Sequence, residues 1–133
     1  MATNRAYEAK SVLSGHNYVV MGSGPTYFTQ FTHGKLTKFR SRYGSSFYLV
    51  IIGDRETESD FYIVPWNSVC NGFTDSLLQE SPRATGHIVK RWVCHIRRGY
   101  LEISKDGFET FRANVGQCKG NDELLNTLLT GGA

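Results

Sequence analysis

The stretch Arg91–Ile103, RWVCHIRRGYLEI, alternates apolar and polar residues on both sides of a turn signal. Arg98-Gly99 fits a two-residue hairpin turn, because glycine readily adopts the positive φ that such turns require. A hairpin with this turn has one register, since a shift of one residue would move every side chain to the other face. Its predicted core face carries Trp92, Cys94, Ile96, Leu101 and Ile103.

The opposite face of the predicted hairpin is polar and aromatic. The register places His95 opposite Glu102 and Arg97 opposite Tyr100. In one interpretation these are cross-strand pairs on a solvated face, each contributing about 0.2–1 kcal/mol. In the other, the face is a rigid basic surface that binds nucleic-acid phosphates, with Tyr100 packing on a sugar or base. The residues of that surface would be Arg83, Lys90, Arg91, His95, Arg97, Arg98 and Tyr100.

The basic residues are concentrated in two zones of the sequence. The formal net charge is +3, four of the 15 Lys and Arg residues lie in the zone 35–42, and five lie in the zone 83–98. Neither zone contains an acid. Two such zones in one small chain favour an anionic partner, although charge runs also occur on ordinary solvated faces.

The first basic zone, KLTKFRSRYG at 35–44, is predicted to be a loop or an edge strand. In an extended chain alternate residues share a face, which would place Lys38, Arg40 and Arg42 together. The glycine and serines that follow would add neutral donors for a phosphate backbone. Alternatively, the cations protect an edge strand from aggregation. The candidate DNA-binding residues in this zone are Lys38, Arg40, Arg42 and Tyr43.

Other segments complete the predicted fold. Continuous apolar runs at 46–52 and 61–65 are typical of strands that are covered on both faces. Further strands are predicted at 16–21 and 26–32, and helices at 5–14, at 121–130, and at 66–71 or 74–79. The predicted fold class is α+β, with a mainly antiparallel sheet, open or barrel-like, and helices near both termini.

Length and composition indicate one globular domain. The chain has 133 residues, of which 40% are hydrophobic and 13% aromatic, enough for one core and rich in residues typical of strands. We expect residues 1–133 to form a single domain, either by itself or as the recognition part of a larger protein. Three cysteines without paired spacing, and the lack of a signal peptide or of the roughly 20 apolar residues of a membrane helix, predict a reducing cytoplasm.

Motifs for catalysis or cofactor binding are weak in this sequence. Asp54, Glu56, Glu58 and Asp60 could supply carboxylates for a metal-dependent nuclease, but they lie in a connection rather than on rigid elements. Histidines and cysteines lack the short paired spacing of a zinc site, and no glycine-rich phosphate loop is present. We therefore predict no metal, no cofactor and no catalytic residue in this domain.

The segments 45–69, SSFYLVIIGDRETESDFYIVPWNSV, and 91–104, RWVCHIRRGYLEIS, resemble accessory DNA-recognition domains attached to bacterial restriction endonucleases. The resemblance implies a sheet-based domain that binds duplex DNA while another domain or subunit cuts it, and it carries over no individual site residue. The function predicted from the sequence is a non-catalytic duplex-DNA-binding module of a bacterial restriction or defence system. A small metal-dependent nuclease and a protein-interaction subunit remain as alternatives.

Overall fold

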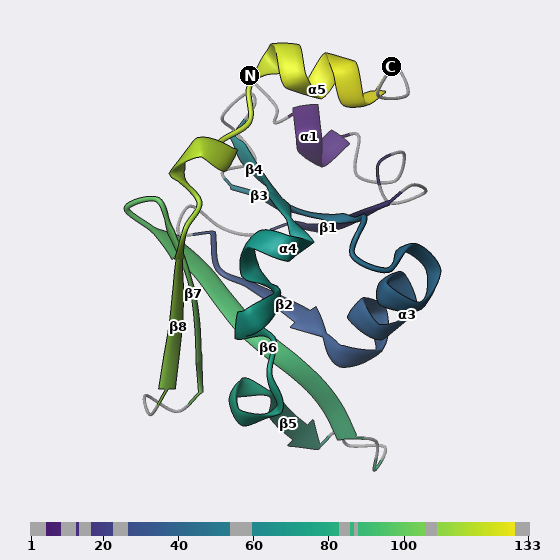
Figure 1. Cartoon of the computed structure of the whole chain (residues 1–133), viewed down its shortest axis with the longest axis vertical. Helices are drawn as coiled ribbons and strands as arrows, with labels where there is room; N and C mark the ends of the chain where they lie inside the picture. Colours follow the sequence, from purple (N-terminus) through teal and green to yellow (C-terminus); the bar gives the residue numbers. More distant parts are fainter. Residues whose placement is uncertain are drawn as a thin grey trace.

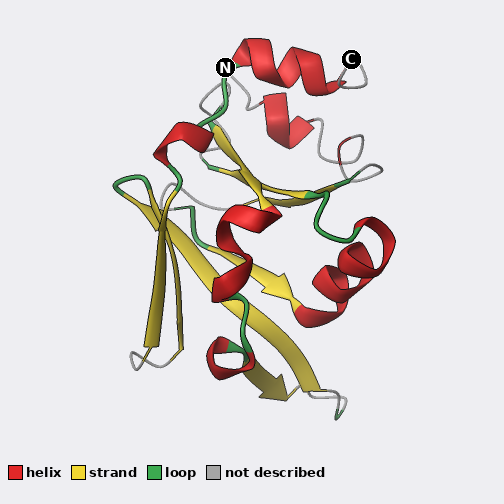
Figure 2. Ribbon diagram, in the orientation of Figure 1, coloured by secondary structure: helices red, strands yellow, loops and turns green. Residues whose placement is uncertain are grey.

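The computed structural model describes residues 5–8, 13, 17–22, 27–53, 60–82, 86, 88–105 and 109–129 (Figures 1 and 2). The helices are α1 (Arg5–Glu8), α3 (His33–Tyr43), α4 (Trp66–Val69) and α5 (Asp122–Leu129), with 3₁₀ turns η1 (Cys70–Gly72), η2 (Asp75–Leu77) and η3 (Gly116–Cys118). The strands are β1 (Tyr18–Gly22), β2 (Thr29–Thr32), β3 (Tyr48–Ile52), β4 (Phe61–Pro65), β5 (Gln79–Pro82), β6 (Ile88–Arg97), β7 (Tyr100–Lys105) and β8 (Glu109–Asn114). These elements confirm the predicted α+β class.

The first sheet, sheet A, has three strands in the order β1-β3-β4. β3 pairs with β1 in parallel and with β4 in antiparallel orientation. Leu49 and Ile51 of β3 join the larger hydrophobic cluster, whereas Val50 and Ile52 join a smaller cluster on the other side of the sheet. This arrangement confirms that the continuous apolar runs form strands covered on both faces.

The second sheet, sheet B, is antiparallel and has five strands. β2 pairs with one edge of β6, and β7 pairs with the opposite edge of β6 and with β8. β5 pairs with the part of β6 that β7 does not reach. A barrel would require β8 to pair with β2, but these two strands are the ends of the sheet instead. The barrel-like alternative is therefore wrong, and the described strands form two open sheets.

The hairpin of β6 and β7 has the predicted register. Ile96 pairs with Leu101 and Arg97 with Tyr100 across a turn formed by Arg98-Gly99. Both turn residues have positive φ, 52° for Arg98 and 79° for Gly99, as a type I′ turn requires. The core side chains of this hairpin are almost fully buried, including Cys94 with an exposed fraction of 0%.

The first basic zone is a helix, α3, and its prediction as a loop or edge strand is wrong. The Thr32 side chain accepts a hydrogen bond from the backbone N–H of Lys35 and caps the start of the helix. Gly44, with φ of 63°, ends it and donates its N–H to the carbonyl of Arg40. Buried Leu36 and half-buried Phe39 and Tyr43 pack against the larger cluster, so tertiary packing selects the helix.

The terminal helices cover the face of sheet A that points away from sheet B (Figure 1). Ala6 of α1 and Leu125 of α5 are buried together with Leu13 and Phe61 in the smaller cluster. Asn121 caps α5, because its side-chain oxygen accepts the N–H of Leu124 at 2.7 Å. Helices near both termini are therefore confirmed.

Sheet A, α3, α4 and sheet B enclose the larger cluster (Figure 2). Phe31 and Trp92 from sheet B, Leu36 from α3, Leu49 from sheet A and Trp66 from α4 all bury their side chains there. Of the two segments predicted as alternatives for a short helix, 66–71 forms α4 and most of η1, whereas 74–79 contains only the 3₁₀ turn η2 before β5 begins. Within the described ranges, each helix is too short or too polar to cross a bilayer.

Candidate nucleic-acid interface

One surface of sheet B gathers most of the predicted hairpin residues. Side chains alternate along β2, β6, β7 and β8, and those that point away from the core form what we call the outer face. The core-facing residues of the paired part of the hairpin are at most 5% exposed, namely Trp92, Cys94, Ile96, Leu101 and Ile103. The outer face consists of Gln30, Thr32, Arg91, Val93, His95, Arg97, Tyr100, Glu102, Ser104, Thr110, Arg112 and Asn114.

A carboxylate in the middle of the outer face connects three strands. One oxygen of Glu102 lies 2.8 Å from Nε2 of His95, and the other lies 3.0 Å from Nε of Arg112. The guanidinium of Arg112 also stacks over the ring of Tyr100, with its Cζ 4.7 Å from the ring centroid. The outer face is therefore a linked network across β6, β7 and β8 rather than a set of independent side chains.

The same contacts shift the titration of Glu102. The hydrogen bond from His95 is the main reason that the pKa of Glu102 lies below its ordinary value, and the charges of His95, Arg112 and Arg97 act in the same direction. Partial burial opposes this shift. Glu102 thus remains ionised at neutral pH and holds the side chains of His95 and Arg112 in place.

The charge of the outer face is positive. Its three arginines, Arg91, Arg97 and Arg112, accompany one acid, Glu102, and His95 adds charge whenever it is protonated. The side chains of Arg97 and Arg112 are exposed, and Arg91 is half-buried. The buried Nε–H of Arg91 has no hydrogen-bond partner in the described part of the chain, so this side chain keeps unused donor capacity.

α3 carries a second group of exposed cations. Lys38 and Arg42 are one helical turn apart and exposed, so they share one side of the helix. The helix begins directly after Thr32, which pairs with Arg91 in the β2–β6 ladder. The start of α3 therefore lies at the edge of the outer face.

Arg40 and Tyr43 point elsewhere than expected. In an extended segment, Arg40 would share a face with its two basic neighbours, but in the helix its guanidinium lies over Trp66, 5.9 Å from the ring centroid. Tyr43 packs against the larger cluster, and the guanidinium of Arg42 lies over its ring at 5.4 Å. The prediction that Lys38, Arg40 and Arg42 form one row is wrong because it assumed a strand.

The structure separates one predicted cation from the hairpin surface. Lys90 lies on the opposite side of β6 from Arg91 and forms an ion pair of 3.8 Å with Glu80. Arg98 is exposed in the turn, beside the outer face, and Arg83 lies outside the described residues. Arg112 was missed, although ETFRAN at 109–114 alternates polar and apolar residues and could have predicted a third strand.

The acidic connection proposed for a nuclease is described only at its end. Residues 54–59 lie outside the described part, whereas the Asp60 carboxylate accepts hydrogen bonds from Tyr27 and, at 2.6 Å, from Nζ of Lys119. Lys119 neutralises this carboxylate, which weakens it as a metal ligand. Across the described ranges, no three His, Cys, Asp or Glu residues are grouped as a metal site would require.

The chain matches no protein-family model, no curated protein and no solved structure. The resemblance to restriction-associated recognition domains therefore stays a prediction, and the function is inferred from the residues of this chain.

Proposed function

We propose that this chain is a non-catalytic module that binds duplex DNA through the outer face of sheet B together with α3. The observation that carries the proposal is the network centred on Glu102, which holds Arg112 and His95 in place on a surface with an excess of positive charge. A fixed arrangement of cations loses less side-chain entropy on binding than mobile surface lysines do. Such a surface favours a polyanion with a regular spacing of charges.

The chemistry assigned to each part follows from its position. Arg97 and Arg112 are exposed and would contact phosphates directly, while Lys38 and Arg42 on α3 would contact the backbone on one side of them. These contacts position the protein on the duplex and carry no base information of their own. Tyr100 is half-buried beneath Arg112, so its main role would be to hold that guanidinium.

The wider setting is part of the same proposal. The resemblance of 45–69 and 91–104 to restriction-associated domains supports a place in a bacterial restriction or defence system, with a separate nuclease domain or subunit as partner. We assign the module to the reducing cytoplasm, which suits three cysteines that are all free thiols.

A salt titration tests the proposal. Binding of a fluorescein-labelled 20-base-pair duplex would be followed by anisotropy from about 50 to 200 mM salt, a range over which phosphate contacts weaken steeply. Replacing both Arg97 and Arg112 by Gln should reduce the slope of log affinity against log salt by about 2, because each lost phosphate contact removes about one unit.

The matched control is Lys90→Gln, which removes one positive charge from the opposite side of the same strand. We expect it to leave the slope nearly unchanged. No binding at about 50 mM salt, or equal effects of the variants per charge removed, would reject the proposal. Retention of a protein partner after nuclease treatment, in the absence of duplex binding, would favour the protein-interaction alternative.

A further inference from the structure

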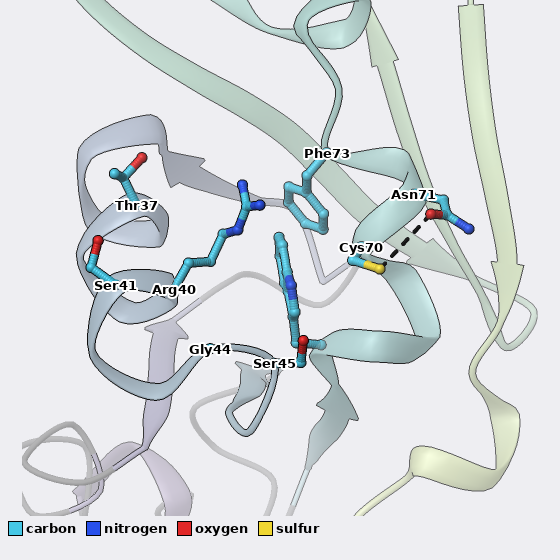
Figure 3. A pocket seen from close by; sticks show the side chains of 9 residues that line it. Thr37, Arg40, Ser41, Gly44, Ser45, Cys70, Asn71 and Phe73 are labelled. Atoms are coloured by element: carbon cyan, nitrogen blue, oxygen red, sulfur yellow. Dashed lines mark hydrogen bonds between the residues drawn. The ribbon is translucent and has the colours of Figure 1, made fainter.

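A pocket of about 630 Å³ lies between α3 and the segment formed by α4 and η1 (Figure 3). Its volume falls in the range of small-molecule binding sites, roughly 300–1,000 Å³. Arg40 extends from α3 into the space between the two walls, toward Phe73, while Thr37 and Ser41 lie on the α3 side and Ser45 near its floor (Figure 3). The pocket is separate from the outer face of sheet B.

A network of rings holds the guanidinium of Arg40 in this pocket. Its Cζ lies over the ring of Trp66 at 5.9 Å. Trp66 is 5% exposed and is fixed by Phe47 and Phe73, each with its ring centroid 5.0 Å away. At 5.9 Å from the Trp66 ring the guanidinium is at the outer limit of a cation–π contact, which does not use its N–H groups, so they remain available for an acceptor.

Among the described residues, no carboxylate pairs with Arg40 inside the pocket. The lining residues include no Asp or Glu, and within the described ranges Arg40 has no ion-pair partner. The end of α3 is also close by, where carbonyl groups carry a partial negative charge that Arg40 and Arg42 offset. An anion would therefore be attracted to this pocket only because Arg40 is present.

The remaining lining groups indicate what else the ligand carries. The hydroxyls of Thr37, Ser41 and Ser45 are on exposed residues and can donate to oxyanion oxygens. The half-buried ring of Phe73 provides an apolar flat surface. A guanidinium, several hydroxyls and an aromatic wall together suit a ligand in which a planar ring is joined to an oxyanion.

We propose that this pocket binds a nucleoside monophosphate, with Arg40 and the neighbouring hydroxyls holding the phosphate and Phe73 contacting the base. This inference adds a second site to the molecule and does not depend on duplex binding at the outer face. It makes no catalytic claim.

Nuclear magnetic resonance of the full chain can test this proposal. The protein has 2 Trp residues, so a ¹⁵N-labelled sample gives two indole signals, and a Trp92→Phe variant identifies that of Trp66. Titration with dAMP should shift the Trp66 signal saturably. Deoxyadenosine and inorganic phosphate, tested separately, should each bind at least about tenfold more weakly, since each lacks one half of the recognition.

Variants test whether the change in the Trp66 signal comes from dAMP binding in the pocket. Arg40→Gln should weaken dAMP binding at least about tenfold, because a charge-assisted hydrogen bond is lost. Arg40→Lys, which keeps the charge but not the planar fork, should give an intermediate affinity, and thermal unfolding of both variants checks that they fold. Lys90→Gln, on a distant surface, should bind dAMP like the wild type.

Three outcomes would overturn the proposal. They are an equal affinity for phosphate and dAMP, a Trp66 signal that does not move, or unchanged dAMP binding by a folded Arg40→Gln variant. The Arg97→Gln, Arg112→Gln double variant separates the two proposals, because it should lose duplex binding and keep dAMP binding. Loss of dAMP binding in that double variant would place the nucleotide on the outer face and reject the pocket.

Discussion

Glu102 and His95 form a hydrogen bond of 2.8 Å across the β6–β7 ladder, in the middle of the basic outer face. Because this bond lowers the pKa of Glu102, the folded protein holds the carboxylate in its charged form more firmly than the unfolded chain does. The resulting stabilisation is fully present above the unfolded pKa of about 4.3 and is lost as the pH falls through the lower folded value.

The first prediction concerns Glu102→Gln and stability. At pH 7 the variant should melt at a lower temperature than the wild type, because Gln makes weaker, uncharged contacts with His95 and Arg112. At pH 3 the difference should shrink, since the stabilisation by the Glu102 carboxylate declines once the pH falls below the unfolded pKa of about 4.3. Thermal unfolding by circular dichroism at both pH values measures this, and an equal difference at pH 7 and pH 3 would contradict the ionic role of Glu102.

The second prediction concerns the same substitution and DNA. Removing the acid raises the charge of the outer face by one and releases Arg112 from its ion pair. Because the proposed interface depends on Glu102 to hold Arg112 and His95 in place, Glu102→Gln should bind duplex more weakly, even though it adds one unit of positive charge. Glu80→Gln, which removes an exposed acid paired with Lys90, provides the control for net charge. Tighter binding by Glu102→Gln, with a steeper slope against log salt, would show that net charge matters more than the positioning of Arg112 and would contradict the role given to the Glu102 network.

The hairpin was predictable because its information is local. A glycine turn set the register of β6 and β7, and strict alternation then assigned each side chain to a face. The helix α3 was not predictable in the same way, since its apolar residues Leu36, Phe39 and Tyr43 form a narrow stripe among cations. Contacts with the larger cluster, formed by distant segments, decide its conformation.

The candidate site was predictable only where its residues lie within one hairpin. Arg91, His95 and Arg97 of β6 were placed on one face correctly, whereas Lys90 lies on the other side. The contact of Glu102 with Arg112 depends on β8, whose polar side chains were not recognised as a third strand. The pocket at Arg40 depends on Trp66 and Phe73, which approach α3 only in the folded chain. Sites built from one hairpin can be predicted from sequence, whereas sites built between distant elements need the tertiary structure.

The third prediction concerns the turn. Arg98 has φ of 52°, a conformation in which Asn is strongly favoured over Arg and which costs other L-residues roughly 1 kcal/mol. Arg98→Asn should therefore stabilise the protein by about 0.5–1 kcal/mol, as an Asn-Gly turn fits the strand twist. Urea unfolding measures the change. Arg97→Asn, the same substitution one residue earlier in the strand, should destabilise instead, and a gain in both variants would mean that charge rather than backbone conformation is responsible.

The fourth prediction concerns Asp60, which has a side chain only 12% exposed and is paired with Lys119. Asp60→Asn should cost about 1–3 kcal/mol in urea unfolding at pH 7, because Lys119 and Tyr27 lose a charged acceptor in a half-buried cluster. Glu80 forms an exposed ion pair with Lys90, with 3.8 Å between the carboxylate oxygen and Nζ. Glu80→Gln should therefore change the free energy of unfolding by less than about 0.5 kcal/mol.

The sign of the Asp60 result also discriminates between functions. Carboxylates gathered for metal catalysis repel one another, so that removing one of them relieves repulsion and commonly stabilises the fold. A carboxylate that neutralises Lys119 behaves in the opposite way, because its removal leaves a cation beside two tyrosine rings, Tyr27 and Tyr62, without its anion. A more stable Asp60→Asn variant would therefore support the nuclease alternative, whereas the expected loss of stability identifies Asp60 as part of the structural link between the start of β4 and the segment that follows β8.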